Sequence, residues 1–119
     1  MIVGIGTDVL CITRIQEKFN KFGLVFVERI LTPEERVVFF SKSRDINFLA
    51  KRFAAKEAIA KAFGVGIGRE LSFQNIEILN DQRGAPIANI IADIGVDKKV
   101  HISISDEADI VVAFAVVSV

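Results

Sequence analysis

The chain has 119 residues, of which 51% are hydrophobic and 25% charged, and its fifteen basic and fifteen acidic side chains cancel at neutral pH. This length fits one hydrophobic core, and the apolar content excludes intrinsic disorder. The balanced charge excludes the broad positive field on which non-specific nucleic-acid binding depends, so we expect no nucleic-acid partner.

A single cysteine, Cys11, excludes an internal disulfide and sites built on paired thiolates. Residues 1–10 lack the basic start and small-residue cleavage site of a signal peptide. The longest apolar stretch, residues 110–117, is too short to span a bilayer. We therefore expect a cytoplasmic protein with no membrane partner.

The first strand and the first helix have distinct patterns. Residues 1–9 are apolar and β-branched around Gly4 and Gly6, which predicts a buried strand that another backbone segment approaches closely. Residues 12–22 keep helical apolar spacing and are followed by Gly23, which predicts an amphipathic helix. The opposite face of this helix is basic and carries Arg14, Lys18 and Lys21.

Two more helices are predicted before the middle of the chain. The run Thr-Pro-Glu-Glu from Thr32 combines an N-cap, a proline at the first helical position and a capping box, which predicts a helix over residues 33–40. Residues 46–63 are mostly good helix formers, and Gly64 follows as a stop signal. They predict a long central helix.

The second half of the chain predicts mainly strands. A strand is expected at residues 73–79, and a second strand or a short helix is expected after Pro86. Two further strands are expected at residues 101–105 and 110–117, joined by a turn at residues 106–109. The last strand is apolar on both faces, which predicts a buried, central position. The whole pattern predicts one compact α+β domain, residues 1–119, with a small, mainly antiparallel sheet packed against the long helix.

Asp8 and Glu57 are acidic residues set among apolar or small neighbours. A buried carboxylate costs free energy unless it meets a cation or a proton. Two carboxylates that converge from a strand end and a helix suit Mg²⁺, which takes few protein oxygens. The alternative is that each carboxylate pairs with a lysine or caps a helix, and spacing alone favours this simpler interpretation.

Glu57 also lies four residues before Lys61, the orientation favoured for an intrahelical ion pair. The functional alternative is that Glu57 holds a metal while Lys61 contacts a phosphate oxygen. His101, the only histidine, shares a strand face with Ser103 and Ser105. This polar face indicates either a site or a hydrogen-bonded structural histidine.

The segments GIGTD at residues 4–8 and RFAAKEAIAK at residues 52–61 together resemble the holo-acyl-carrier-protein synthases, the small bacterial phosphopantetheinyl transferases. The resemblance continues through residues 28–32, 64–68, 71–78, Gly84, Pro86 and 101–105, and so covers most of the chain. It implies the phosphopantetheinyl transferase fold, a homotrimer with sites between subunits, and transfer of 4'-phosphopantetheine from coenzyme A to a serine of apo acyl carrier protein. This reaction releases adenosine 3',5'-bisphosphate and serves fatty acid biosynthesis.

The same resemblance implies roles for individual residues. Asp8 and Glu57 would hold Mg²⁺, and Lys61 would contact coenzyme A phosphates, so that these three form the catalytic set. Four residues would border the nucleotide: Arg52, Gly64, Gly84 and His101. The acidic carrier protein would dock on Arg14, Lys18, Lys21, Phe26 and Arg44. For Lys18 and Lys21 the alternative, a plain solvated helix face, stays open.

Two features depart from the family. Asp106 stands where family members commonly have a second histidine, so that residue's role is not carried over, and the segment between Pro86 and His101 looks shortened. Two other functions compete with the transferase. One is a magnesium-dependent phosphohydrolase, and the other is a non-catalytic oligomeric binding module in which Glu57 and Lys61 only pair with each other.

Overall fold

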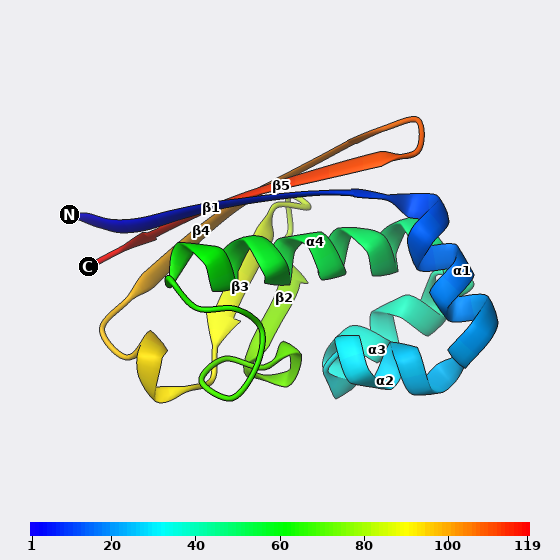
Figure 1. Ribbon diagram of the computed structural model, residues 1–119, viewed down its shortest axis with the longest axis horizontal. Coiled ribbons are helices and arrows are strands. Elements are labelled where there is room, and N and C mark those ends of the chain that lie inside the picture. Colours follow the sequence, from blue (N-terminus) through cyan, green and yellow to red (C-terminus); the bar gives the residue numbers. More distant parts are fainter.

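The computed structural model describes residues 1–119 and contains two antiparallel sheets and four α-helices (Figure 1). The helices are α1 (Ile12–Phe22), α2 (Leu24–Ile30), α3 (Pro33–Ser41) and α4 (Ile46–Ala62). The first sheet has the order β1-β5-β4, with β1 (Ile2–Cys11), β5 (Ile110–Ser118) and β4 (Lys99–Glu107), and the second pairs β2 (Ile76–Asn80) with β3 (Pro86–Ile90). The α+β class is confirmed, but the single predicted sheet is in fact two.

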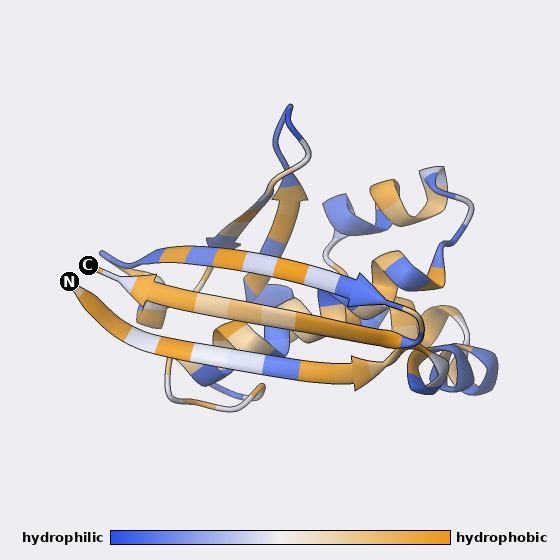
Figure 2. Cartoon of the chain, turned by 90° about the horizontal axis from the view of Figure 1, so that it is seen from above, coloured by the Kyte–Doolittle hydropathy of each residue, from blue (hydrophilic) through white to orange (hydrophobic).

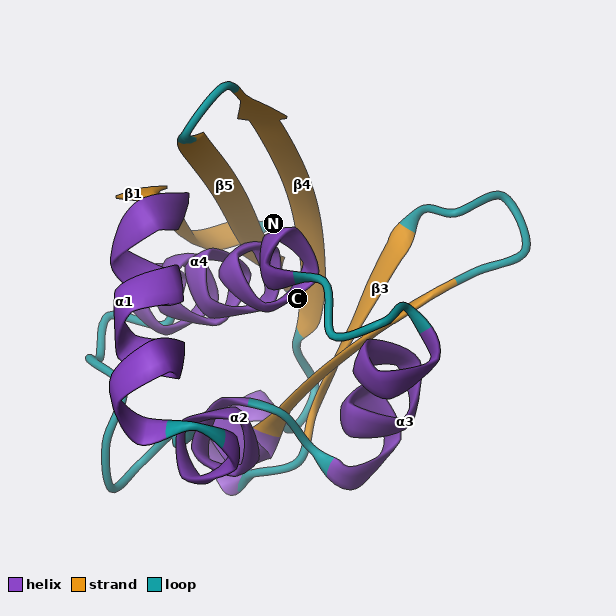
Figure 3. Cartoon of the chain, turned by 90° about the vertical axis from the view of Figure 1, so that its right-hand side faces the viewer, coloured by secondary structure: helices purple, strands orange, loops and turns teal.

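The long helix α4 packs along one face of the three-stranded sheet, and α1, α2 and α3 gather at one end of it (Figures 1 and 3). Close approach of α4 to β1 depends on two glycines. A β-carbon added at Gly4 would overlap the carbonyl oxygen of Ala62, and one added at Gly6 would overlap that of Ala58. The predicted close backbone approach at these glycines is therefore confirmed.

Replacing Gly6 with Ala is expected to destabilise the fold, because the new β-carbon would also lie 2.6 Å from the Ala62 amide nitrogen, and backbone atoms of α4 cannot swing aside. We expect a loss of about 1–3 kcal/mol in the free energy of unfolding, as for other overpacked sites. Chemical denaturation measures it. Gly66→Ala is the matched control, since a β-carbon there meets open space; equal losses in both variants would contradict the packing argument.

Strand β5 occupies the centre of its sheet, as predicted, but only one of its faces is buried. Four residues face α4 and are fully or almost fully buried: Val111, Ala113, Ala115 and Val117. On the other face, Val112 and Phe114 remain 42% and 40% exposed, beside Ile5 and Val9 of β1 at 62% and 64%. Figure 2 shows the apolar character of β5 along most of its length. Burial on both faces was thus wrong for the single chain, which leaves one apolar sheet face uncovered.

Most helix boundaries follow the predicted signals. Helix α1 has the predicted bounds and ends at Gly23, whose φ is 62°, while the capping box of α3 joins Thr32 and Glu35. Helix α2 was not predicted, because its apolar residues show no clear polar face. The strand predicted from residue 73 begins at Ile76, because Ser72 and Asn75 cap a short 3₁₀ turn over Phe73–Asn75.

The later boundaries differ more. The alternative of a strand after Pro86 is confirmed, and the segment between this strand and His101 contains a single 3₁₀ turn, Asp93–Gly95. Strands β4 and β5 run further than expected, so that only Ala108 and Asp109 form the turn between them. None of the four helices combines the length and the apolar character needed to cross a bilayer.

A buried ion pair joins four elements in the core. The Lys56 ammonium lies 2.6 Å from Glu35 Oε1 and donates to the carbonyls of Ile30 at 2.7 Å and Phe73 at 3.0 Å. Both side chains are fully buried. Burial lowers the pKa of Lys56, and the Glu35 carboxylate opposes that shift. The pair therefore fixes α4 relative to the end of α2, the start of α3 and the segment before β2.

Candidate functional site

Asp8, Glu57 and Lys61 lie together where β1 crosses α4. Asp8 shares the inward face of β1 with Gly6 and Leu10, so its side chain points at the helix and is only 16% exposed. The Lys61 ammonium lies 3.1 Å from Asp8 Oδ1 and donates to the Thr7 carbonyl at 3.0 Å. More than half of the Lys61 side chain, 54%, is exposed. Its ammonium is therefore held at the rim of the site, where an anion can reach it.

Glu57 completes a two-carboxylate set. The pKa of Glu57 is raised, first by partial burial and then by the nearby negative charge of Asp8, while Lys61 opposes the shift. Glu57 forms no ion pair with Lys61, which pairs with Asp8 instead, so the predicted intrahelical pair was wrong. Two carboxylates that repel each other in a half-buried site fit a divalent cation, and the donor set suits Mg²⁺. No group of three potential ligands is present, so water and substrate would supply the other oxygens.

Replacing Glu57 with Gln is expected to stabilise the metal-free protein at neutral pH. The folded-state pKa of Glu57 lies above its ordinary value of 4.5, so the folded state binds its proton more tightly than the unfolded state does. Stability from this group is complete below the unfolded pKa and is lost as pH rises through the raised folded pKa. In a chelator, thermal unfolding should give Glu57→Gln the higher Tm at pH 7 and no advantage below about pH 4. A lower Tm at pH 7 would contradict the assignment.

A cleft of about 120 Å³ beside the carboxylates is lined by Asp8 and Glu57 on one side and by Arg14 and Lys18 of α1 on the other. Lys21 continues the basic face beyond the cleft, where it shares a shallow hollow with Arg14 and Lys18. The structure thus brings the basic helix predicted to dock a carrier directly against the acidic pair. An acidic partner on α1 would be placed next to any cation held there.

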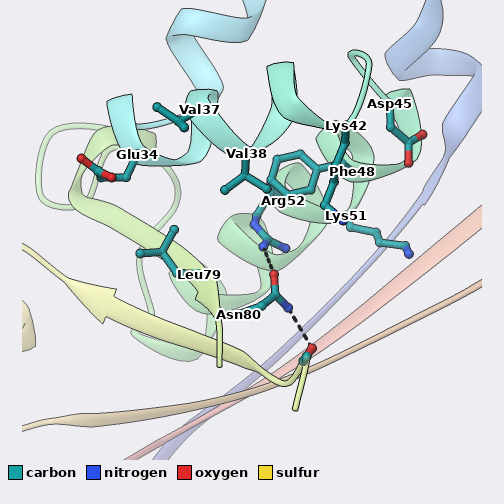
Figure 4. Close-up of a pocket in the computed structure, with 11 residues that line it drawn as sticks. Glu34, Val37, Val38, Lys42, Asp45, Phe48, Lys51, Arg52, Leu79 and Asn80 are labelled. Atoms are coloured by element: carbon teal, nitrogen blue, oxygen red, sulfur yellow. Dashed lines mark hydrogen bonds between the residues drawn. The ribbon is translucent and has the colours of Figure 1, made fainter. Parts of the chain in front are cut away.

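A larger pocket of about 640 Å³ lies on another side of α4, between α3 and the β2–β3 hairpin (Figure 4). Arg52 Nη2 donates to Asn80 Oδ1 at 2.7 Å, and Asn80 Nδ2 donates to the Gly84 carbonyl at 2.8 Å. The guanidinium stacks over the Phe48 ring at 4.5 Å, and its buried Nε has no partner. Burial lowers the pKa of Arg52, while Glu35 opposes the shift. The pocket therefore contains a fixed positive group that suits an anionic ligand.

Other predicted site residues are not brought together within one chain. His101 lies at the start of β4, lines a separate cavity with Lys98 and Lys99, and has Nε2 3.3 Å from Ser118 Oγ. His101 therefore lies outside the pocket of Arg52, although both residues were expected to border one nucleotide. Gly64 follows α4 with a φ of 78°, close in sequence to Lys61.

Two of the expected docking residues lie away from α1's basic face. Phe26 is 8% exposed and belongs to the core, where its ring centre is 6.5 Å from that of Phe53. A buried Phe26 is not available to the carrier protein as the docking residue that the resemblance implied. Arg44 lies in the turn before α4, between two residues that line the larger pocket, with its guanidinium over the Phe40 ring at 5.4 Å. Arg44 itself lines neither that pocket nor the carboxylate cleft.

Sequence reasoning missed Lys51 and Asn80, which line the larger pocket. Lys51 also forms an ion pair of 3.2 Å with Asp106, the residue at the position of the family's second histidine. The buried Lys56 left a signal: Ile59 and Ala60, three and four residues further along on the same helix face, are apolar and buried, which indicates a lysine without access to solvent. Asn80 had no comparable signal, because its role depends on the hairpin's position in space.

The comparisons with known proteins agree over almost the whole chain. A family described as the 4'-phosphopantetheinyl transferase superfamily matches residues 4–115. The holo-[acyl-carrier-protein] synthase of Neisseria meningitidis serogroup A is 48% identical and that of a Geobacillus species 45%, and the matches cover 98% of this chain and 98% and 97% of those proteins.

Solved structures are similar as well. The crystal structure of the Neisseria meningitidis synthase has a TM-score of 0.90 at 45% identity, and the match covers 99% of both chains. A Bacillus anthracis synthase in complex with CoA (3',5'-ADP) has a TM-score of 0.87 at 46% identity, with coverage of 98% of this chain and 96% of that one.

Proposed function

The chain belongs to the 4'-phosphopantetheinyl transferase superfamily, and we infer that it acts as a holo-[acyl-carrier-protein] synthase. It transfers the 4'-phosphopantetheine group of coenzyme A to a serine of apo acyl carrier protein and releases adenosine 3',5'-bisphosphate. The holo carrier serves fatty acid biosynthesis. The single free thiol, Cys11, is consistent with a reducing compartment, and we assign the reaction to the cytoplasm.

The observation that carries this proposal is the placement of Asp8, Glu57 and Lys61 beside the basic face of α1. A pair of carboxylates with one lysine is suited to a diphosphate with its cation. A basic helix next to it is suited to an acidic carrier protein. A hydrolase would need only the first of these features, so the adjacent basic helix favours a transferase.

In the reaction, the serine hydroxyl of the carrier loses its proton to solvent and its oxygen forms a bond to the β-phosphorus. The bond between that phosphorus and the oxygen bridging to the α-phosphate breaks, and this oxygen leaves on adenosine 3',5'-bisphosphate. Asp8 and Glu57 would hold Mg²⁺, which when bound offsets the negative charge gathered on the diphosphate. Lys61, fixed by Asp8 and the Thr7 carbonyl, directs its ammonium toward a phosphate oxygen. The chain's own side chains thus orient the diphosphate for attack.

The nucleotide site is proposed to be shared between copies of the chain. The Arg52 pocket and the carboxylate cleft open on different sides of α4, and His101 lines a third cavity. A neighbouring copy could supply Arg52, Gly84 or His101 to the site that contains Asp8. The uncovered apolar face of β1 and β5 supports such an assembly, because apolar area of this kind is buried in stable oligomers. We propose a homotrimer.

Replacing Phe114 with Arg is expected to break this assembly, because the side chain stands at the centre of the uncovered face and is 40% exposed in the single chain. A charge buried there without a partner would cost several kcal/mol per copy, on the order of the penalty for other unpaired buried ions. Sedimentation equilibrium should give the parent a mass of three chains and the variant a mass of one. Val37→Arg, a change at an apolar side chain of α3 that is 66% exposed, is the control; a monomeric parent would contradict the trimer.

Product analysis tests the proposed reaction against its alternatives. The protein is incubated with coenzyme A, Mg²⁺ and apo acyl carrier protein, and released nucleotide is measured by chromatography. A transferase releases adenosine 3',5'-bisphosphate in equal amount with modified carrier, and releases none when carrier is omitted. A phosphohydrolase would release nucleotide without modifying the carrier, and a binding module would release none.

A further inference from the structure

The start of α1 lacks a cap from its own sequence. Its N-cap residue, Cys11, makes no side-chain capping hydrogen bond, and no acidic residue lies in the first turn. The cap comes instead from Asp109, which lies 96 residues after Thr13. Asp109 Oδ1 accepts from the Thr13 amide at 3.0 Å, and the Thr13 hydroxyl lies 2.8 Å from each carboxylate oxygen. The carbonyl of Asp109 also accepts from the Ile12 amide at 2.7 Å.

Asp109 is held in place by the two-residue turn between β4 and β5. Ala108, the first residue of this turn, has a φ of 51°, a left-handed conformation that alanine rarely adopts. The surrounding strands therefore hold a locally unfavourable backbone. As a result, the side-chain carboxylate and the backbone carbonyl of Asp109 both point at the free amides at the start of α1, where the helix dipole also favours a negative charge.

The helix that this cap fixes is the one proposed to meet the carrier protein. Arg14 directly follows Thr13 and lines the cleft with Asp8 and Glu57. A small rotation of the first turn would move the Arg14 side chain away from the carboxylates. Of the side chains of α1, Ile12 and Ile15 are buried in the core and Phe19 is partly buried against it, whereas Arg14 lies on the opposite, polar face and gains no hold from this packing.

We propose that Asp109 is a positioning residue for carrier-protein recognition: it fixes the start of α1 and thereby holds Arg14 beside the two carboxylates. This inference rests on the proposed transferase function. It assigns Asp109 an effect on the binding of the carrier and none on the coenzyme A site. It also gives the β4–β5 turn a role in recognition, although the turn itself need not touch the carrier.

Steady-state kinetics of carrier modification test the proposal. Asp109→Ala should raise the KM for apo carrier protein about tenfold, the equivalent of one lost helix cap, while kcat and the KM for coenzyme A change less than about twofold. Asp109→Asn should restore most of the affinity, because an asparagine oxygen can accept the same hydrogen bond. Thr13→Val combined with Asp109→Ala should add little to the effect of Asp109→Ala.

Gln74→Ala is the matched control, because the Gln74 side chain donates to the carbonyls of Glu28 and Leu31 and so caps α2 away from the cleft. It should lower Tm without changing the KM for carrier. Equal changes in kcat and in both KM values for Asp109→Ala, or no rescue by Asp109→Asn, would overturn the positioning role in favour of general stability. Failure of the proposed function is recognised separately, since the parent protein itself would then modify no carrier.

Discussion

Replacing Asp8 with Asn is expected to lower the rate of carrier modification at least about a hundredfold, as the loss of one fixed charge-stabilising group does in other enzymes. The change keeps the size of the side chain but removes the charge that fixes Lys61 and, with Glu57, would hold Mg²⁺. Its effect on folding should be small, because Asp8 is the only acidic partner of a largely exposed lysine. Turnover is measured at saturating coenzyme A and carrier.

Two further measurements separate this effect from a general one. Asp93→Asn removes an exposed carboxylate in the 3₁₀ turn before β4, and it should leave turnover unchanged. Raising the Mg²⁺ concentration should recover part of the rate of Asp8→Asn if weakened cation binding causes the loss. Parent-like turnover in Asp8→Asn would remove Asp8 from the catalytic set.

Replacing Glu35 with Ala is expected to cause the largest loss of stability, about 3–5 kcal/mol in the free energy of unfolding. The change leaves the fully buried Lys56 ammonium without its counter-charge. It also removes the acceptor of two backbone amides, those of Thr32 and Ile78, each at 2.7–2.8 Å from a Glu35 oxygen. An unpaired buried charge and two unsatisfied donors act in the same direction.

The Lys51–Asp106 pair provides the comparison, because both its side chains are about one-third exposed. Asp106→Ala should cost no more than about 1 kcal/mol. Urea denaturation of the two variants under one set of conditions gives both values. A loss for Glu35→Ala as small as that for Asp106→Ala would mean that the buried pair does not hold the elements together.

Local signals were enough for several elements of the fold. The capping residues Thr32 and Glu35 marked the start of α3, and Gly23 marked the end of α1, because each acts within one turn of its own helix. Gly4 and Gly6 indicated the close approach of another backbone, although not which segment approaches. These predictions succeeded because their physical causes lie in neighbouring residues.

Features that depend on distant parts of the chain could not be predicted. The ion pair of Lys56 with Glu35 and the cap that Asp109 supplies to Thr13 join residues 21 and 96 positions apart in the sequence. Phe26 was expected to contact the carrier protein from the family resemblance alone, whereas its burial follows from how α2 packs on Phe53. Spacing alone favoured an ion pair between Glu57 and Lys61. Lys61 pairs with Asp8 instead, because β1 crosses α4 at this point.

The sequence predicted the grouping of the two carboxylates with Lys61 better than it predicted the grouping of the residues expected to border the nucleotide. Asp8, Glu57 and Lys61 come from two segments whose motifs are each specific, and the structure brings them together. Arg52 and His101 lie in separate pockets of one chain, so the proposed common nucleotide site would need a neighbouring copy. A sequence describes one chain and does not show which copies meet.

The most direct test of the central claim is the intact mass of apo acyl carrier protein after incubation with this protein, coenzyme A and Mg²⁺, beside a sample with chelator and one with Asp8→Asn. We predict a gain of one phosphopantetheine per carrier with the parent protein, and no gain in the other two samples. A carrier of unchanged mass after incubation with the folded parent protein would contradict the transferase function, and a gain that persists in chelator would contradict the role of the two carboxylates as a metal site.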